Sequence, residues 1–297
     1  MHDEFLRDSA IGELDIYYMQ DAASEVETRS FLAARLPGVD AASFHFPWAI
    51  IPPGVDTTRV LKLCVDDRDA SVVELPDVIR TLPNLLWLDM PRRFVPNLTQ
   101  EALPPTVRTL RLTGGGNVAL PRSLVLPKLE RLIGGRDAVL KFSRHQIPNV
   151  TDLEVKFDPG GSVLREAVGM EKLVALAAVP FSNRGILEAV ARLPLRFLKA
   201  SRGNLDTVEP LRDCPTLTDL WLEGLTKLTS IASLADLPRL RELSVTYCSK
   251  LQLDRSLLRF PALRRLMFFA CKDIGLAPLR PEIERLRLDH FLPSGTT

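Results

Sequence analysis

The stretch from Leu217 to Leu251, LTDLWLEGLTKLTSIASLADLPRLRELSVTYCSKL, contains one short pattern of residues twice. LTDLWL begins at Leu217 and LRELSV begins at Leu240, and a Pro-x-Leu step leads into each copy. Both copies follow the form L-x-x-L-x-L, and alternate residues of an extended strand point to opposite faces. The stretch therefore predicts two strands that bury leucines on one face and present the intervening residues on the other.

The same form recurs along most of the chain, about every 22 residues. With substitutions by other apolar residues, it starts at Thr58, Leu85, Val107, Leu129, Val150, Leu173, Leu195, Leu217, Leu240, Leu263 and Ile283. A period in the twenties is typical of solenoid proteins. One repeat is too small to close a core, so we expect stacked neighbours to cover each other's leucines.

These repeats resemble the leucine-rich-repeat family over roughly residues 58–292, with about 11 repeats of about 22 residues. The resemblance implies an α/β solenoid curved like a horseshoe, with a parallel β-sheet on its concave face. On the convex face we expect short helices and extended turns, with helices after Ser162 and Ser182. The family's usual asparagine after each strand is mostly missing, and Cys248 and Cys271 replace it in two repeats. The subclass therefore stays open, while the style of the repeats favours a bacterial protein.

Residues 1–57 do not keep the period, and we expect them to form an N-terminal cap over the apolar end of the stack. Within them, residues 11–19 predict a first strand, residues 24–36 a helix, and residues 44–46 alternate as in a strand. A separate interaction module is the alternative interpretation of this segment. Residues 293–297 form a short C-terminal tail, which leaves the last repeat thinly covered.

The charge balance gives no general reason to bind a nucleic acid or an anionic membrane. The chain has 38 Lys and Arg residues and 37 Asp and Glu residues, a net charge of +1. Its start, MHDEFLRDSAIGEL, is acidic where a signal peptide is basic, and no later stretch is apolar for long enough to span a bilayer. We therefore expect a cytoplasmic protein without a membrane segment.

No sequence motif points to a cofactor or a metal ion. The glycine runs at residues 114–116 and 134–135 lack the rest of a phosphate-binding motif, and they follow strands, where a turn needs glycine. Cys248 and Cys271 occupy equivalent positions in successive repeats, where a metal pair or a reversible disulfide is the alternative. Buried thiols that pack as small apolar groups are the favoured interpretation.

One pair of carboxylates has the arrangement of a catalytic pair. Asp152 and Glu154 lie two residues apart on one predicted strand, so their side chains share a face. A shallow sheet offers no substrate pocket beside them, and a solvated charge cluster is the favoured interpretation. We therefore expect a protein that is not an enzyme.

The third, fifth and seventh residues of each repeat are expected to face solvent on the concave sheet. Between Ala175 and Phe269 they form a run of apolar side chains bordered by both signs of charge, a composition typical of protein interfaces. Trp221 is the predicted anchor for a partner. The full predicted partner-binding set is Trp87, Phe197, Lys199, Asp219, Trp221, Glu223, Arg265, Met267, Phe269 and Arg287.

The sequence thus favours a non-catalytic scaffold that binds a protein or peptide on its concave face, and neither a nucleic acid nor a membrane. A regulatory or specificity subunit of an enzyme complex is one alternative. A structural solenoid that assembles with copies of itself through its thinly covered C-terminal end is the other.

Overall fold

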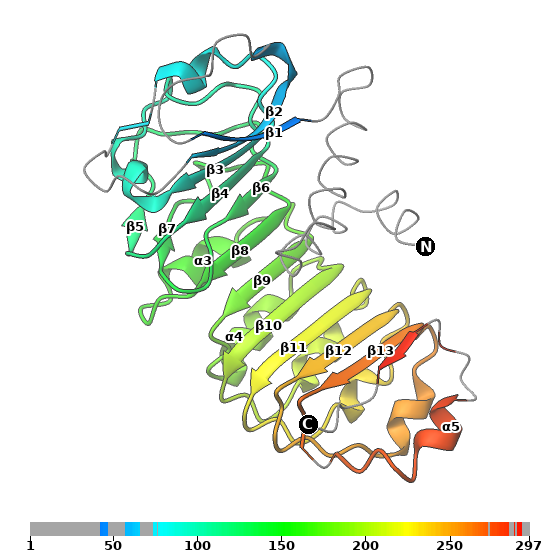
Figure 1. The fold of residues 1–297 in the computed structure, drawn as a ribbon. Helices are drawn as coiled ribbons and strands as arrows, with labels where there is room; N and C mark the ends of the chain where they lie inside the picture. The colour runs from blue at the N-terminus through cyan, green and yellow to red at the C-terminus, as the bar shows by residue number, and fades with distance from the viewer. Residues whose placement is uncertain are drawn as a thin grey trace. The chain divides into compact units, whose positions relative to one another are not determined.

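Each repeat contributes one strand to a parallel sheet, as the periodicity predicts (Figure 1). The structure is a computed structural model of the 297-residue chain. It describes residues 42–46, 57–65, 74, 75, 77–272, 274–284, 288 and 290–292. The chain divides into two compact units, Met1–Glu166 and Ala167–Thr297. Each unit is a solenoid in which neighbouring repeats pair strand to strand.

In the first unit, the described strands of the main sheet lie in chain order and pair in parallel. They are β1 (Ala42–Phe46), β2 (Val60–Val65), β3 (Trp87–Pro91), β4 (Thr109–Thr113), β6 (Arg131–Ile133) and β8 (Asp152–Lys156). A second, two-stranded parallel sheet consists of β5 (Val118–Ala119) and β7 (Leu140–Lys141). The return segments hold the 3₁₀ helices η2 (Thr57–Arg59), η3 (Asp77–Thr81) and η4 (Arg92–Asn97).

In the second unit, the described strands again pair in parallel in chain order. They are β9 (Ala175–Val179), β10 (Phe197–Gly203), β11 (Asp219–Leu225), β12 (Glu242–Thr246), β13 (Arg265–Phe269) and β14 (His290–Leu292). The connections hold α4 (Arg184–Ala191), η5 (Glu209–Asp213), η6 (Ala232–Leu234), η7 (Arg255–Arg259) and α5 (Arg280–Glu284), and α3 (Ser162–Val168) joins β8 to β9 in sequence.

The inward leucines line up from strand to strand. Leu198 is paired with Leu220, Leu220 with Leu243, and Leu243 with Leu266, and none of them is more than 1% exposed. Burying one leucine side chain stabilises a fold by roughly 1.5–3 kcal/mol, and here each rung is buried by the next. The predicted register is confirmed, because every strand from β2 to β13, apart from β5 and β7 of the small sheet, begins two residues after a predicted repeat start.

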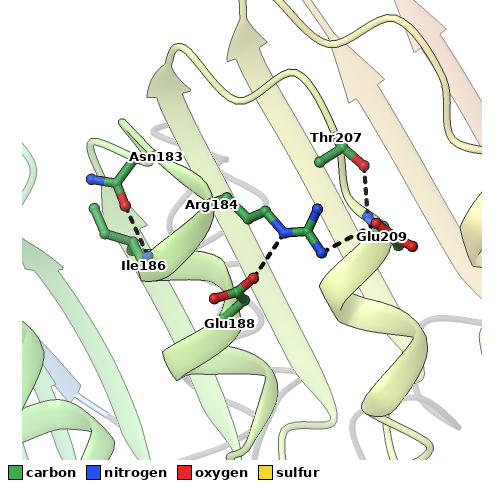
Figure 2. A network of polar contacts seen from close by, with 6 residues as sticks. All are labelled: Asn183, Arg184, Ile186, Glu188, Thr207 and Glu209. Atoms are coloured by element: carbon green, nitrogen blue, oxygen red, sulfur yellow. Dashed lines mark hydrogen bonds and ion pairs between the residues drawn. The ribbon is translucent and has the colours of Figure 1, made fainter.

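Both predicted helices are present in the segments that connect one strand to the next. α3 begins at Ser162, which is therefore its first residue rather than the cap residue expected in front of it. The N-cap of α4 is Asn183, one residue beyond the expected Ser182, and its Oδ1 accepts a hydrogen bond from the Ile186 N–H at 3.1 Å (Figure 2). An asparagine side chain satisfies a free N–H at the helix start as well as a serine does.

The eleventh repeat start was predicted wrongly. Ile283 lies in α5 and is buried, so it is a core residue of a helix rather than the start of a strand. Pro281 is the second residue of α5, a position in the first turn where proline is well tolerated. The last described strand is β14, which pairs with β13.

At the other end, the strand predicted at residues 44–46 is β1. It pairs in parallel with β2 and so adds a rung to the repeat sheet. The predicted strand at 11–19, the predicted helix at 24–36 and the tail at 293–297 lie outside the described residues. The boundary of the cap at residue 57 therefore stays a prediction.

Gly203→Ala is expected to destabilise the second unit by more than about 3 kcal/mol, because β10 ends against another backbone segment. A Cβ atom at Gly203 would lie 1.9 Å from the Phe181 carbonyl oxygen, and the Phe181 N–H is itself bonded to the Arg202 carbonyl at 2.9 Å. Urea unfolding followed by circular dichroism measures the loss. Gly115→Ala is the control, because nothing lies within 4 Å of a Cβ there. Equal stability of the two variants would contradict the close approach.

Candidate functional site

The outer face of the second unit's sheet carries the third, fifth and seventh residues of its repeats. Parallel pairing arranges these residues in rows that cross the strands, about 4.8 Å from one strand to the next. The first row is Ala175, Phe197, Asp219, Glu242 and Arg265, the second is Ala177, Lys199, Trp221, Ser244 and Met267, and the third is Ser201, Glu223, Thr246 and Phe269. At this spacing, neighbours in a row contact each other directly.

Trp221 lies at the centre of this face. Its ring packs edge-to-face on Phe197, with 5.4 Å between ring centroids, and the Lys199 ammonium lies 5.7 Å from its centroid. Its indole Nε1 donates a hydrogen bond to Glu242 Oε1 at 3.0 Å. Contacts with Phe197, Lys199 and Glu242 therefore fix the orientation of the Trp221 ring, the predicted anchor.

The charged side chains of the face neutralise one another across neighbouring strands. The Lys199 Nζ lies 2.8 Å from Glu223 Oε2, and the Arg265 Nη1 lies 3.3 Å from Glu242 Oε2. Burial lowers the pKa of Lys199, and the hydrogen bond and charge of Glu223 oppose that shift. These charges form ion pairs within the chain, and Lys199, Glu223 and Arg265 of the predicted partner-binding set belong to them.

Exposure along the outer face differs from the sequence-based expectation. Phe197 is 3% exposed and Lys199 and Asp219 are buried, whereas Trp221 and Met267 are partly buried. Phe269 is exposed, as predicted. The difference arises because large side chains in adjacent rungs cover each other, which a single repeat does not reveal.

Trp87, the predicted partner-binding residue of the first unit, is also buried. It is 1% exposed, its Nε1 donates to Asp89 Oδ1 at 2.6 Å, and the cations of Lys62 and Arg131 lie 5.0 and 5.7 Å from its ring centroid. Cation–π contacts on a desolvated ring stabilise such a cluster. Arg287, the last residue of the predicted set, lies outside the described residues.

The structure adds Tyr247, which the sequence reasoning missed. Tyr247 follows β12 and is exposed, and its ring packs edge-to-face on Phe269, with 5.7 Å between centroids. It adopts φ 55°, and Arg202, Gly224 and Ala270 adopt φ between 50° and 64° at the same place in their repeats. Among these four equivalent positions, Gly224 was the one sequence signal of a left-handed residue. The left-handed backbone ends the alternation of side chains along the strand, so that alternation does not predict the direction of Tyr247.

Comparison with known proteins supports the fold. No family model matches the chain, and no curated protein sequence matches it. A leucine-rich-repeat protein of Leptospira interrogans has a similar structure, with a TM-score of 0.50 and 17% identity over 86% of this chain and 72% of that one. The chain is a leucine-rich-repeat protein by its fold.

Two further solved structures resemble this leucine-rich-repeat chain more weakly. An internalin of Listeria monocytogenes has a TM-score of 0.48 and 14% identity over 81% of this chain and 75% of that one. TLR13, solved in complex with a single-stranded RNA, has a TM-score of 0.37 and 15% identity over 72% of this chain and 43% of that one.

Asp219 is a buried carboxylate on the outer face. Its Oδ2 accepts a hydrogen bond from Thr218, while its Oδ1 accepts none from the described residues. Burial raises the pKa of Asp219 to about 6 and the charge of Glu242 adds to the rise, whereas the Thr218 hydrogen bond and the charges of Arg196 and Arg241 oppose it. The folded leucine-rich-repeat chain therefore holds a proton on Asp219 more tightly than the unfolded chain does.

Asp219→Asn is expected to stabilise the protein in a pH-dependent way. The folded pKa of Asp219 lies above its ordinary value of 3.8, so its contribution to stability is fully present below that value and is lost as the pH rises through about 6. The variant should raise the free energy of unfolding by roughly 2–3 kcal/mol near pH 7.5 and leave it nearly unchanged near pH 4. Urea unfolding at both pH values measures the difference.

The control for this prediction is Asp213→Asn, which removes an exposed carboxylate that precedes the same strand. It should change stability by less than about 0.5 kcal/mol at either pH. A gain from Asp219→Asn that is the same at both pH values would show that its charge is not the cause.

Cys248 and Cys271 each lie two residues beyond a strand, β12 and β13, where the family pattern usually has asparagine. The Cys248 Sγ lies 4.0 Å from the Leu222 carbonyl, and the Cys271 Sγ lies 3.5 Å from the Val245 carbonyl, each in the strand of the preceding repeat. Burial raises the pKa of Cys248 to about 12 and also raises that of Cys271. Both thiols are buried and neither forms a disulfide, which confirms their expected role as small buried residues.

Thiol reactivity tests this assignment. In a Cys64→Ser variant, we expect Cys214, Cys248 and Cys271 to react with Ellman's reagent more than about a hundredfold more slowly in the native protein than in guanidinium, because buried neutral thiols are poor nucleophiles. The Cys64 side chain lies outside the described residues, so this substitution removes it from the measurement. A thiol that reacts at once in the native protein would instead support metal or disulfide chemistry.

The other sequence candidates are structural. Gly114, Gly116 and Gly135 adopt positive φ in turns after β4 and β6, as the turn interpretation predicts. Asp152 and Glu154 are buried rather than solvated, because the parallel register places them beside Arg131 and Ile133 of β6. Among the described residues, no group of three or more His, Cys, Asp or Glu side chains has the arrangement of a metal site.

A polar groove of about 320 Å³ lies between α4 and η5. Arg184 bridges the two elements, with its Nε 2.8 Å from Glu188 Oε1 and its Nη2 3.3 Å from Glu209 Oε2 (Figure 2). The charged residues that line the groove are Arg184, Arg192, Arg212, Glu188, Glu209 and Asp213. Their charges cancel, so the groove favours neither an anion nor a cation.

In the part of the chain that the structure describes, no helix is both long enough and apolar enough to cross a bilayer.

Proposed function

We propose that this leucine-rich-repeat chain is a non-catalytic interaction module whose partner, a protein or peptide, binds the exposed end of the outer face. The observation that carries the proposal is the exposed ring pair of Tyr247 and Phe269, which are 55% and 42% exposed. Among the described residues, the one other exposed large apolar side chain is Val125. Exposed aromatic rings grouped on a regular sheet are typical of protein interfaces.

The sheet gives these two rings a rigid support. β12 and β13 pair along their full length, and Thr246, the neighbour of Tyr247, is in register with Phe269. Met267, partly buried, lies on the same strand as Phe269 and next to Ser244. Side chains that are already held in place lose less conformational entropy when a partner binds, which favours affinity.

The role of Trp221 changes in this proposal. Because it is partly buried and bonded to Glu242, it supports the face from within and contributes a smaller part of the contact than predicted. Glu223 and Arg265 remain partly accessible at its edges and supply the charged rim. The ring pair takes over the role of anchor.

The proposal places the protein in the cytoplasm and excludes a membrane. Three buried free thiols fit a reducing compartment. A protein partner is favoured over a nucleic acid because the net charge is only +1 and the isoelectric point of about 7.7 is below the range of about 9 or more typical of nucleic-acid-binding domains.

A double variant, Tyr247→Asn and Phe269→Ala, is expected to weaken partner binding by about 2 kcal/mol or more, roughly thirtyfold in Kd. Asn tolerates the left-handed backbone at position 247, so the fold should be retained. The wild-type chain is immobilised to retain proteins from native extract, the retained protein is purified, and its Kd for both chains is measured by calorimetry.

Val125→Ala is the matched control, because it removes an exposed apolar side chain of similar accessibility outside the outer face. It should bind the partner with wild-type affinity. An unchanged Kd for the double variant would reject the ring pair as the anchor. Self-association of the wild-type chain in sedimentation that the double variant abolishes would favour the self-assembling solenoid, and an enzyme as the retained protein would favour the regulatory-subunit alternative.

A further inference from the structure

Three exposed arginines form a row along the edge of the second unit's sheet where its strands begin. Arg196, Arg241 and Arg264 directly precede β10, β12 and β13. Backbone hydrogen bonds align them: Arg241 N–H donates to the Thr218 carbonyl at 2.7 Å, Thr218 N–H to Arg196 at 2.8 Å, and Arg264 N–H to Arg241 at 2.8 Å. The arginine row, Arg196, Arg241 and Arg264, therefore crosses four neighbouring strands, with Thr218 in the place before β11.

The three guanidinium groups are not held by close contacts inside the chain, although the charges of Arg196 and Arg241 act on the buried carboxylate of Asp219. Their side chains are exposed, and none forms a hydrogen bond or ion pair with another described residue. The next arginine, Arg265, is different, because Glu242 neutralises it at 3.3 Å. Lys199 and Arg265 form ion pairs across the strands, whereas the three arginines of the row are exposed and form none with a described residue, which leaves their donors open to an anionic partner.

We infer that the arginine row binds an acidic segment of the partner, an inference that rests on the proposed function. A guanidinium group matches a carboxylate with two parallel hydrogen bonds, which gives geometric specificity as well as attraction. From Arg196 to Arg264 the row spans three strand spacings, about 14 Å, the length of about four residues of extended chain. The matching segment carries acidic side chains about four residues apart and runs across the strands.

A peptide fits the surroundings of the row better than a nucleic acid does. Asp219 and Glu242 begin β11 and β12, immediately beside the arginines. A backbone with a phosphate at every unit would place negative charge near these carboxylates, whereas a peptide can place a neutral residue there. The low net charge of +1 points the same way.

The test is a fluorescence-anisotropy titration of the full chain against fluorescein-labelled hexaglutamate at about 20 mM salt, where exposed charges are weakly screened. We expect the wild-type chain to bind and the variant Arg196→Gln, Arg241→Gln, Arg264→Gln to bind at least about fivefold more weakly, since each exposed pair adds a modest amount. Raising the salt to about 200 mM should weaken wild-type binding toward that of the variant.

The matched control is Arg122→Gln, Arg144→Gln, Arg212→Gln, which removes the same charge from exposed arginines outside the row. It should keep wild-type affinity within about twofold. Circular dichroism confirms that both triple variants are folded.

Three results would overturn the inference: no binding by the wild-type chain, equal losses in the two triple variants, or tighter binding of a charge-matched oligothymidylate that the row variant abolishes. The last result would assign the row to a nucleic acid. These results leave the test of the Tyr247 and Phe269 variant unaffected, because that variant is measured with the native partner. A failure of the arginine-row inference is therefore distinguishable from a failure of the proposed function.

Discussion

The stacking of one leucine rung on the next is the interaction on which the rest of the molecule depends. No single repeat can bury Leu220 and Leu222 by itself, and neighbouring strands cover both almost completely. The strand spacing of about 4.8 Å that this packing requires also sets the distance between outward side chains. The outer face is thus organised by the core behind it.

This spacing explains why much of the outer face is a network rather than a display of separate side chains. Trp221, Lys199, Glu223 and Glu242 are close enough to stack and to form ion pairs, and in doing so they exclude water from one another. The raised pKa of Asp219 and the lowered pKa of Lys199 both follow from that loss of water. The exposed side chains that a partner could contact are therefore concentrated where the strands begin and where they end.

The two ends of the strands differ in the side chains that they expose. Where β12 and β13 end, the left-handed residue Tyr247 places its exposed ring against that of Phe269, the last residue of β13. Where the strands begin, Arg241 and Arg264 are exposed, and their side chains form no ion pair with a described residue. A partner that contacted both ends of the strands would meet a basic site where they begin and an apolar site where they end, about 16 Å apart along the strand. Such a pairing of an apolar anchor with charged contacts is how interfaces combine affinity with orientation.

The sequence by itself determined the repeat, its register and which residues face inward, because alternation along a strand and the length of a repeat are local properties. It also anticipated the buried cysteines, whose equivalent positions in two repeats are visible in the letters. It could not determine how much of Phe197 or Trp87 stays accessible, because accessibility depends on side chains contributed by other rungs. It did not reveal that Ile283 belongs to a helix, or that Tyr247 leaves the alternation of its strand. Those outcomes depend on packing and on backbone turns that take shape only when the rungs are stacked, so tertiary structure alone decided which of the outward residues can meet a partner.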